Sequence, residues 1–271
     1  MTNPTFIFVD GSYYCFYRFY ALVNWWKRAH PEEPLENPID NAVFVEKFKK
    51  TFVEHLEEIP ERLDIDKEAN IILYAAKDCK RENIWRTELF PKYKANRLYD
   101  DGFKGGPFFQ MAYQEQLFQQ GGAQEVFSHP RLEADDCIAI TVKQCVEKYP
   151  ESDVYIIASD HDYLQLQSEH VKIRTLTYKN IAESKTSTGD AKKDLLIKII
   201  KGDVSDNIPS VFPKCGFKTA LKCSEDPAYL EKKMAGNPEY EKKYQFNETL
   251  VNFDKIPQEL VEEFLLHTKH N

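Results

Sequence analysis

The amino-acid sequence predicts an α/β fold with a mostly parallel central sheet flanked by helices. Three apolar runs, at 6–10, 70–78 and 153–162, have the length of strands and are rich in β-branched and aromatic residues. Helix-like stretches separate these runs, at 40–59, 107–120 and 133–149. Alternating strands and helices favour a parallel sheet, because each connection must cross back over the sheet.

The composition indicates a packed protein without a membrane span. Of the 271 residues, 42% are hydrophobic, which is enough for a core. No apolar run reaches the roughly 18 residues that cross a bilayer, and the N-terminus lacks the basic region of a secretory signal. The six cysteines contain no CxxC pair, which is typical of reduced thiols. We therefore expect an intracellular protein.

The charge is acidic overall but unevenly distributed. A formal net charge of −8 argues against a simple nucleic-acid-binding protein. However, residues 77–97 contain seven Lys or Arg against three acids. Lys214, Lys218 and Lys222 recur at a spacing of four, which places them on one face of a helix. An acidic chain with basic stripes can bind polyanions through bridging metal ions.

Acidic residues follow each of the three predicted strands. Asp10, Asp78 and Asp160 lie at the ends of these runs. In open α/β sheets, ligands bind outside the carboxyl ends of the strands. Two further acidic clusters, EADD and GDVSDNIP, bring the candidates to nine: Asp10, Asp78, Glu133, Asp135, Asp136, Asp160, Asp162, Asp203 and Asp206.

Carboxylates gathered at one edge cannot all stay ionised without cations. Mg²⁺ suits sites with few carboxylates and several waters, and two such ions about 4 Å apart serve in-line phosphodiester displacement. Local structure offers another interpretation. Residues 133–136 favour a helix N-terminus, and the acids near 160 and 206 are common in turns.

The chain also shows an internal division. Residues 98–110 contain three glycines and a proline, as a loop or hinge does. Strand-like runs stop near residue 185, and residues 190–271 have helical patterns. We therefore predict an α/β unit at 1–185 and a helical unit at 186–271.

Five motifs resemble the 5′-nuclease superfamily, which includes flap endonucleases, phage 5′→3′ exonucleases and the 5′-nuclease domain of bacterial DNA polymerase I. They occur in the family order over about residues 5–225: VDGSYY, IWRTELFPKYKANR, EADD, SDHDYLQL and GDVSDNIPSV. The resemblance implies a PIN-like nuclease domain at 1–185 and a helical arch at about 98–120. It also implies a helix–hairpin–helix-type subdomain at 186–271 that binds duplex DNA.

The resemblance also implies roles for single residues. The first metal would be held by Asp10, Asp78, Glu133 and Asp135. The second site would use Asp136, Asp160, Asp162, Asp203 and Asp206. Lys94 and Arg97 match basic residues at the base of the arch, and Lys94 or Arg86 would stabilise charge on the scissile phosphate. Tyr93 would either stack on a base or pack in the interior.

Three positions depart from the family pattern. By strand position, Ala75 stands where many members have an acid, so we assign that role to Asp78. His161 separates Asp160 from Asp162, and we interpret it as an exposed, tolerated residue. The hairpin FPKCGFKTA keeps only Gly216 and the KTA ending, and Lys214 replaces a small residue where the family often binds K⁺. Duplex binding is expected from five residues: Lys214, Gly216, Lys218, Thr219 and Lys222.

The expected function is a Mg²⁺-dependent, structure-specific 5′ nuclease, with Mn²⁺ as a substitute ion. It would act as a monomer during DNA replication, repair or recombination, on branched or 5′-flap DNA and on RNA/DNA primer junctions. The C-terminus, VEEFLLHTKHN, contains no clear motif for a sliding clamp. One alternative is a PIN-class ribonuclease, which the lysine stripe disfavours. The other is a non-catalytic binding module, which the acidic set disfavours.

Overall fold

The central sheet has five strands, all parallel, in the order β3-β2-β1-β4-β5. A computed structural model describes residues 3–97 and 102–268. The strands are β1 (Thr5–Asp10), β2 (Ile71–Ala76), β3 (Glu125–Phe127), β4 (Val154–Ile157) and β5 (Val171–Arg174). The predicted α/β class is confirmed. β3 and β5 were not predicted: β3 has only three residues, and β5 is a four-residue strand, VKIR, in which charged residues alternate with apolar ones.

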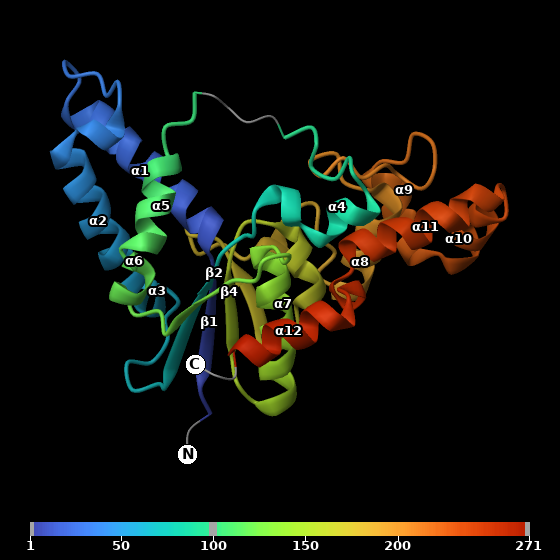
Figure 1. The fold of residues 1–271 in the computed structure, drawn as a ribbon. Coiled ribbons are helices and arrows are strands. Elements are labelled where there is room, and N and C mark those ends of the chain that lie inside the picture. The colour runs from blue at the N-terminus through green and yellow to red at the C-terminus, as the bar shows by residue number, and fades with distance from the viewer. Residues whose placement is uncertain (1–2, 98–101, 269–271) are drawn as a thin grey trace.

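Helices cover both faces of the sheet (Figure 1). One face packs against α1 (Gly11–Ala29), α2 (Ala42–Glu57), α5 (Gly106–Gln114) and α6 (Leu117–Gln120). The other packs against α7 (Ala134–Lys148) and α12 (Gln258–Thr268). Short helices complete these connections: η1 (Pro38–Asp40), α3 (Ile59–Arg62), η2 (Arg81–Asn83), α4 (Trp85–Leu89), η3 (His161–Leu166), η4 (Ile181–Glu183) and η5 (Phe253–Lys255).

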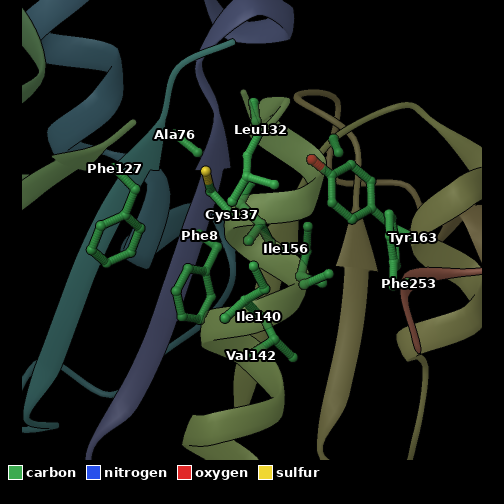
Figure 2. Packing of buried hydrophobic residues seen from close by; sticks show 14 of the residues in the cluster. Phe8, Ala76, Phe127, Leu132, Cys137, Ile140, Val142, Ile156, Tyr163 and Phe253 are labelled. Carbon is green, nitrogen blue, oxygen red and sulfur yellow. The ribbon is translucent and has the colours of Figure 1, made fainter. Parts of the chain in front are cut away.

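Alternation along the strands builds the two cores. Phe8 of β1 faces α7, whereas its neighbour Ile7 faces α1 and α2, as the pleat requires. Figure 2 shows Cys137 and Ile140 of α7 packed toward Phe8. This packing holds the first turn of α7 at the carboxyl edge of the sheet.

Helix α1 was not predicted as an element, because its aromatic residues have low helix propensity. Tertiary packing overrides that preference. Cys15, Phe19, Leu22 and Trp26 recur at helical spacing and are buried. The carboxylate of Asp10 caps the helix by accepting a hydrogen bond from the Tyr13 backbone N–H at 2.9 Å.

The helices after residue 190 form a further core, separate from the two on the faces of the sheet. It involves α8 (Ala191–Lys201), α9 (Phe217–Glu225), α10 (Pro227–Met234) and α11 (Pro238–Val251). The chain then returns to the sheet. Phe253, Leu260 and Phe264 are buried with α7, and the Phe264 ring centroid lies 5.8 Å from that of Phe127. Residues 253–268 therefore pack against the α/β part, although the boundary that we predicted near residue 185 assigns them to the helical unit.

The region expected to form an arch lies only partly within the described residues. Residues 98–101 fall outside them. Helices α5 and α6 lie beside α1 and α2 in Figure 1. Phe108 and Phe118 of these helices are buried in the core of that face. Helices α5 and α6 are thus part of a packed layer. Among the described residues, no helix is both long and apolar enough to cross a membrane.

Gly11→Ala should destabilise the fold. A Cβ at residue 11 would overlap the carbonyl oxygen of Ala76 and lie 2.6 Å from the Tyr113 hydroxyl, so β1, β2 or α5 must shift. We expect a loss of about 1–3 kcal/mol in the free energy of unfolding, measured by urea denaturation. Gly106→Ala is the matched control, since a Cβ there meets nothing within 4 Å. Equal stabilities of the two variants would contradict this packing.

Candidate active site

The sheet gathers the predicted acids at its carboxyl edge. Asp10 is the last residue of β1, and Asp78 and Asp160 lie shortly after the ends of β2 and β4. Asp10 accepts a hydrogen bond from the Tyr163 hydroxyl at 3.1 Å. Asp78 accepts hydrogen bonds from the Ser12 hydroxyl at 2.5 Å and from the Ala134 backbone N–H at 2.8 Å. Asp78 therefore joins the end of β2 to the starts of α1 and α7.

Neither Ala75 nor His161 contacts the acids at this edge through a hydrogen bond or ion pair in the described residues, although His161 lines the cleft beside Asp160. Ala75 is buried within β2, in the core of the α1 face. The ring of His161 contacts Ser184 and Thr186, with its Nε2 atom 3.0 Å and 3.2 Å from their hydroxyl oxygens. Within the described chain, Asp78 is thus the acid that follows β2 at the edge.

The EADD motif begins α7 and forms an acidic cluster. Carboxylate oxygens of Glu133, Asp135 and Asp136 lie within 4.8 Å of one another. Glu133 and Asp136 also form a capping box, in which each side chain accepts a hydrogen bond from the other residue's backbone N–H. The two interpretations of this motif are therefore compatible: it caps a helix and also concentrates negative charge.

Arg86 neutralises part of this cluster from within the protein. Its guanidinium donates to Asp136 at 2.7 and 2.8 Å and to Glu133 at 3.0 Å, while Nε donates to the Leu250 carbonyl at 2.7 Å. Arg86 is only 2% exposed. This geometry joins α4, α7 and α11. A guanidinium buried and paired in this way is not open to a substrate phosphate, so Arg86 does not fit the role of stabilising charge on the scissile phosphate.

Tyr93 and Lys94 also contact Glu133. The Tyr93 hydroxyl donates to Glu133 at 3.0 Å, and its ring is buried, which matches interior packing and not an open stacking surface. The Lys94 ammonium pairs with the other oxygen of Glu133. Lys94 has a φ of 54°, in the left-handed region, and its backbone N–H donates to the Asp206 carbonyl at 3.0 Å. This turn directs the lysine side chain toward α7.

A second acidic group lies between η3 and the end of α8. Lys198 of α8 forms ion pairs with both Asp162 and Asp203. Arg97 pairs with Asp206, and its side chain remains 49% exposed. Lys198 was not among the site residues predicted from the sequence. The available signal was its place inside the apolar run LLIKII, where an isolated lysine needs a buried partner.

The nine acids therefore divide into two sets. Glu133, Asp136, Asp162, Asp203 and Asp206 each pair with a lysine or arginine of the chain. The other four have no Lys, Arg or His of the described residues at ion-pair distance: Asp10, Asp78, Asp135 and Asp160. Within the described residues, the second set thus has nearby cations at most and no ion pair.

The proton affinities follow this division except at Asp206, where burial raises the pKa despite the pair with Arg97. Burial, together with the charge of Asp78, raises the pKa of Asp10 to about 7. Burial and Asp162 raise the pKa of Asp160 to about 6. Burial and Glu133 raise the pKa of Asp135 well above its ordinary value. Burial alone would also raise the pKa of Asp203, but the Lys198 ammonium holds it below its ordinary value.

These residues fit hard divalent cations. The donors are carboxylate oxygens, which Mg²⁺, Mn²⁺ and Ca²⁺ prefer. One buried oxygen, Oδ1 of Asp162, accepts no hydrogen bond despite its ion pair. Cations at this edge would supply the charge that Asp10, Asp135 and Asp160 lack. A cleft of about 380 Å³ opens beside the second group and is lined by Asp160, Lys198, Lys201 and Asp203 among others.

The predicted DNA-binding lysines lie away from the acids, on α9 and the turn before it. Lys214, Lys218 and Lys222 are all exposed, whereas Ala220 and Cys223 of the same helix are buried. Gly216 is the N-cap residue of α9, and Thr219 is partly buried in its first turn. The lysines thus form a cationic stripe on the outer face of the helical unit.

The described residues thus combine a parallel sheet, clustered carboxylates at its carboxyl edge and a basic segment beside them. The sequence model of the 5′-3′ exonuclease N-terminal resolvase-like domain matches residues 5–193. The chain belongs to this family of nucleases, as the motifs indicated.

Relatives by sequence agree with the family. The chain is 28% identical over 241 residues to DNA polymerase I of Streptococcus pneumoniae, covering 85% of this chain but 25% of the polymerase. It is 32% identical over 150 residues to a 5′-3′ exonuclease of Bacillus subtilis, covering 51% of this chain and 47% of that protein. The chain thus spans a quarter of its polymerase relatives.

Solved structures show the same fold. The D15 protein of bacteriophage T5, co-crystallised with metal ions, matches with a TM-score of 0.63 at 18% identity, over 96% of this chain and 97% of that one. The T5 D15 flap endonuclease in complex with DNA and metal ions matches with a TM-score of 0.61 at 16% identity, over 96% of each chain. The PIN-like fold that the resemblance implied is confirmed.

Arg86→Met should be strongly destabilising. It leaves Asp136 and Glu133 buried beside an apolar side chain, which typically costs about 3–5 kcal/mol. Urea denaturation measures the loss. Lys143→Met removes an exposed pair with Asp254 and serves as the control, with an expected loss of about 0–1 kcal/mol. Similar losses in both variants would show that the buried pairs contribute no more than surface ones.

The metal-free protein should lose stability as the pH rises from about 5 to about 8. The pKa of Asp10, about 7, lies above its ordinary value of 3.8, so the folded chain retains a proton that the unfolded chain releases. The stability linked to this proton is complete below the ordinary pKa and is lost as the pH rises through about 7.

Melting temperatures in EDTA at both pH values test this expectation in wild type and Asp10→Asn. Asparagine keeps the helix cap of Asp10 but does not titrate. The variant should therefore show a smaller drop between the two pH values. An equal drop would exclude Asp10 as the source.

Proposed function

We propose that the chain is a divalent-metal-dependent, structure-specific 5′ nuclease that cuts DNA near junctions of single strand and duplex. The observation that carries this proposal is the set of four acids that form no ion pair among the described residues, Asp10, Asp78, Asp135 and Asp160, at the sheet edge of a 5′-3′ exonuclease family member. Mg²⁺ is the proposed ion, with Mn²⁺ as a substitute. When bound, two such ions would activate water and stabilise charge on the attacked and leaving oxygens.

The side chains would divide the work as follows. Asp10, Asp78, Glu133 and Asp135 would hold the first ion, and Asp160, Asp162, Asp203 and Asp206 the second. We assign Asp136 and Arg86 to positioning, because their buried pair fixes the start of α7. The Lys94 ammonium, held at the cluster by Glu133, would face the scissile phosphate.

Substrate binding would use the exposed cations. Arg97 retains an exposed side chain beside the second acidic group and would contact the phosphate backbone near the cut. Lys214, Lys218 and Lys222, with the backbone of Gly216 and Thr219, would hold the duplex. Such contacts read shape and charge, so we propose 5′-flap DNA and RNA/DNA primer junctions as substrates, met by a monomer at sites of DNA replication.

A flap-cleavage assay tests the function. A duplex with a 5′ single-stranded flap is labelled at each end in turn and incubated with Mg²⁺ or with chelator. Metal-dependent release of the flap near the junction supports an endonuclease, and stepwise mononucleotides support an exonuclease. Cleavage of single-stranded RNA alone would replace the proposal with a PIN-class ribonuclease. Binding without cleavage of any substrate would replace it with a non-catalytic module.

Asp135→Asn should abolish cleavage and keep DNA binding. The change removes one carboxylate that forms no ion pair among the described residues but leaves the exposed lysines in place. We expect a loss of at least about 10³-fold in the single-turnover rate, with the dissociation constant for the flap duplex unchanged within about threefold. Asp254→Asn, at an exposed acid paired with Lys143, is the control. Wild-type rates in Asp135→Asn would remove this residue from the site.

A further inference from the structure

Lys198 holds two proposed ligands of the second ion together. It forms ion pairs with Asp162 of η3 and with Asp203, just after α8. Its side chain is only 16% exposed. The ammonium therefore lies among the carboxylates, in the position that a cation shared by both acids would take.

The fold keeps this lysine in place. Ile197, Ile199 and Ile200 of α8 are buried, and the helix packs against η3. The carboxylate of Asp190 caps α8 by accepting hydrogen bonds from the backbone N–H groups of residues 192 and 193. The packing of α8 against η3 fixes Lys198 beside Asp162 and Asp203. The two carboxylates are therefore held together without a metal ion.

A divalent ion at the same carboxylates would meet an obstacle. Asp162 and Asp203 already have a positive partner at contact distance, and like charges repel strongly in a partly buried site. By contrast, three of the four acids proposed for the first ion, Asp10, Asp78 and Asp135, form no ion pair among the described residues, and the fourth, Glu133, pairs with Arg86 and Lys94. The two ions of the proposed centre should therefore bind with unequal affinity.

We propose that Lys198 is a tethered cation that occupies the place of the second ion and makes loading of that ion depend on DNA. One divalent ion binds the metal-free chain beside Asp10, Asp78 and Asp135. The second binds when a backbone phosphate of the substrate draws the Lys198 ammonium away from Asp162 and Asp203. Lys198 is thus a positioning residue that couples substrate binding to completion of the centre, and this inference rests on the proposed function.

Titration with Mn²⁺ tests the inference, with calorimetry for affinity and electron paramagnetic resonance for the number of bound ions. The full chain is titrated with and without the nicked duplex product of flap cleavage. Wild type should bind one ion tightly without DNA, and the second at least tenfold more tightly with DNA. If the wild-type chain binds two Mn²⁺ ions with equal affinity in the absence of DNA, that result by itself overturns the proposal.

Lys198→Met should bind the second ion at least tenfold more tightly than wild type in the absence of DNA. Lys201→Met is the matched control, since Lys201 lies on the same helix and lines the same cleft but forms no ion pair within the described part of the chain. Loss of the second ion in Lys198→Met would mean that the lysine supports the site and would contradict the proposal.

Folding and function are checked separately. Melting curves show whether Lys198→Met folds, and Lys198→Gln, which keeps a polar tip, replaces it if it does not. The same prediction holds for both variants. If wild type loads its ions in the predicted order but cuts no flap, the proposed function fails and the inference about Lys198 stands. If the wild-type chain cuts the flap but binds both ions with equal affinity without DNA, the inference about Lys198 is wrong and the proposed function stands.

Discussion

Repulsion among carboxylates at one edge of the sheet is the constraint on which the rest of the structure depends. The parallel strands bring Asp10, Asp78 and Asp160 to that edge, and the start of α7 adds Glu133 and Asp135. A folded chain must relieve this repulsion by protonation or with cations. The protein supplies only part of the relief. Arginines and lysines from α4, the following turn and α8 reach into the edge and pair with specific acids.

The placement of these cations divides the acids into those that form ion pairs and those that form none among the described residues. The pair between Arg86 and Asp136 is buried and ties the start of α7 to α4 and α11, so the helical unit is anchored at the same place as the acidic cluster. Asp10, Asp135 and Asp160 are left with raised pKa values and no ion-pair partner among the described residues. This unrelieved charge is the reason that we propose a metal centre at this edge in addition to the helix cap.

Much of this arrangement follows from the sequence, and the rest depends on tertiary contacts. The strand-end acids were predictable, because apolar runs of strand length end beside them and parallel strands share one carboxyl edge. β3 was too short to predict, and α1 has a composition that disfavours helices. The burial of Arg86 was not predicted, and the sequence left Tyr93 open between stacking and interior packing. Both residues lie in a basic segment whose inward face is set by α7 and α11.

The central claim is that divalent ions bind at the acids that lack protein cations. Anomalous diffraction at the manganese edge, from crystals of the full chain soaked in Mn²⁺, tests it directly. The predicted result is a peak within coordination distance of Asp10, Asp78 and Asp135, with Asp136 still paired to Arg86. Two results would contradict the division of charge described above. One is a peak bound by Asp136, with Arg86 displaced. The other is the lack of any peak at the sheet edge in crystals that bind Mn²⁺ elsewhere.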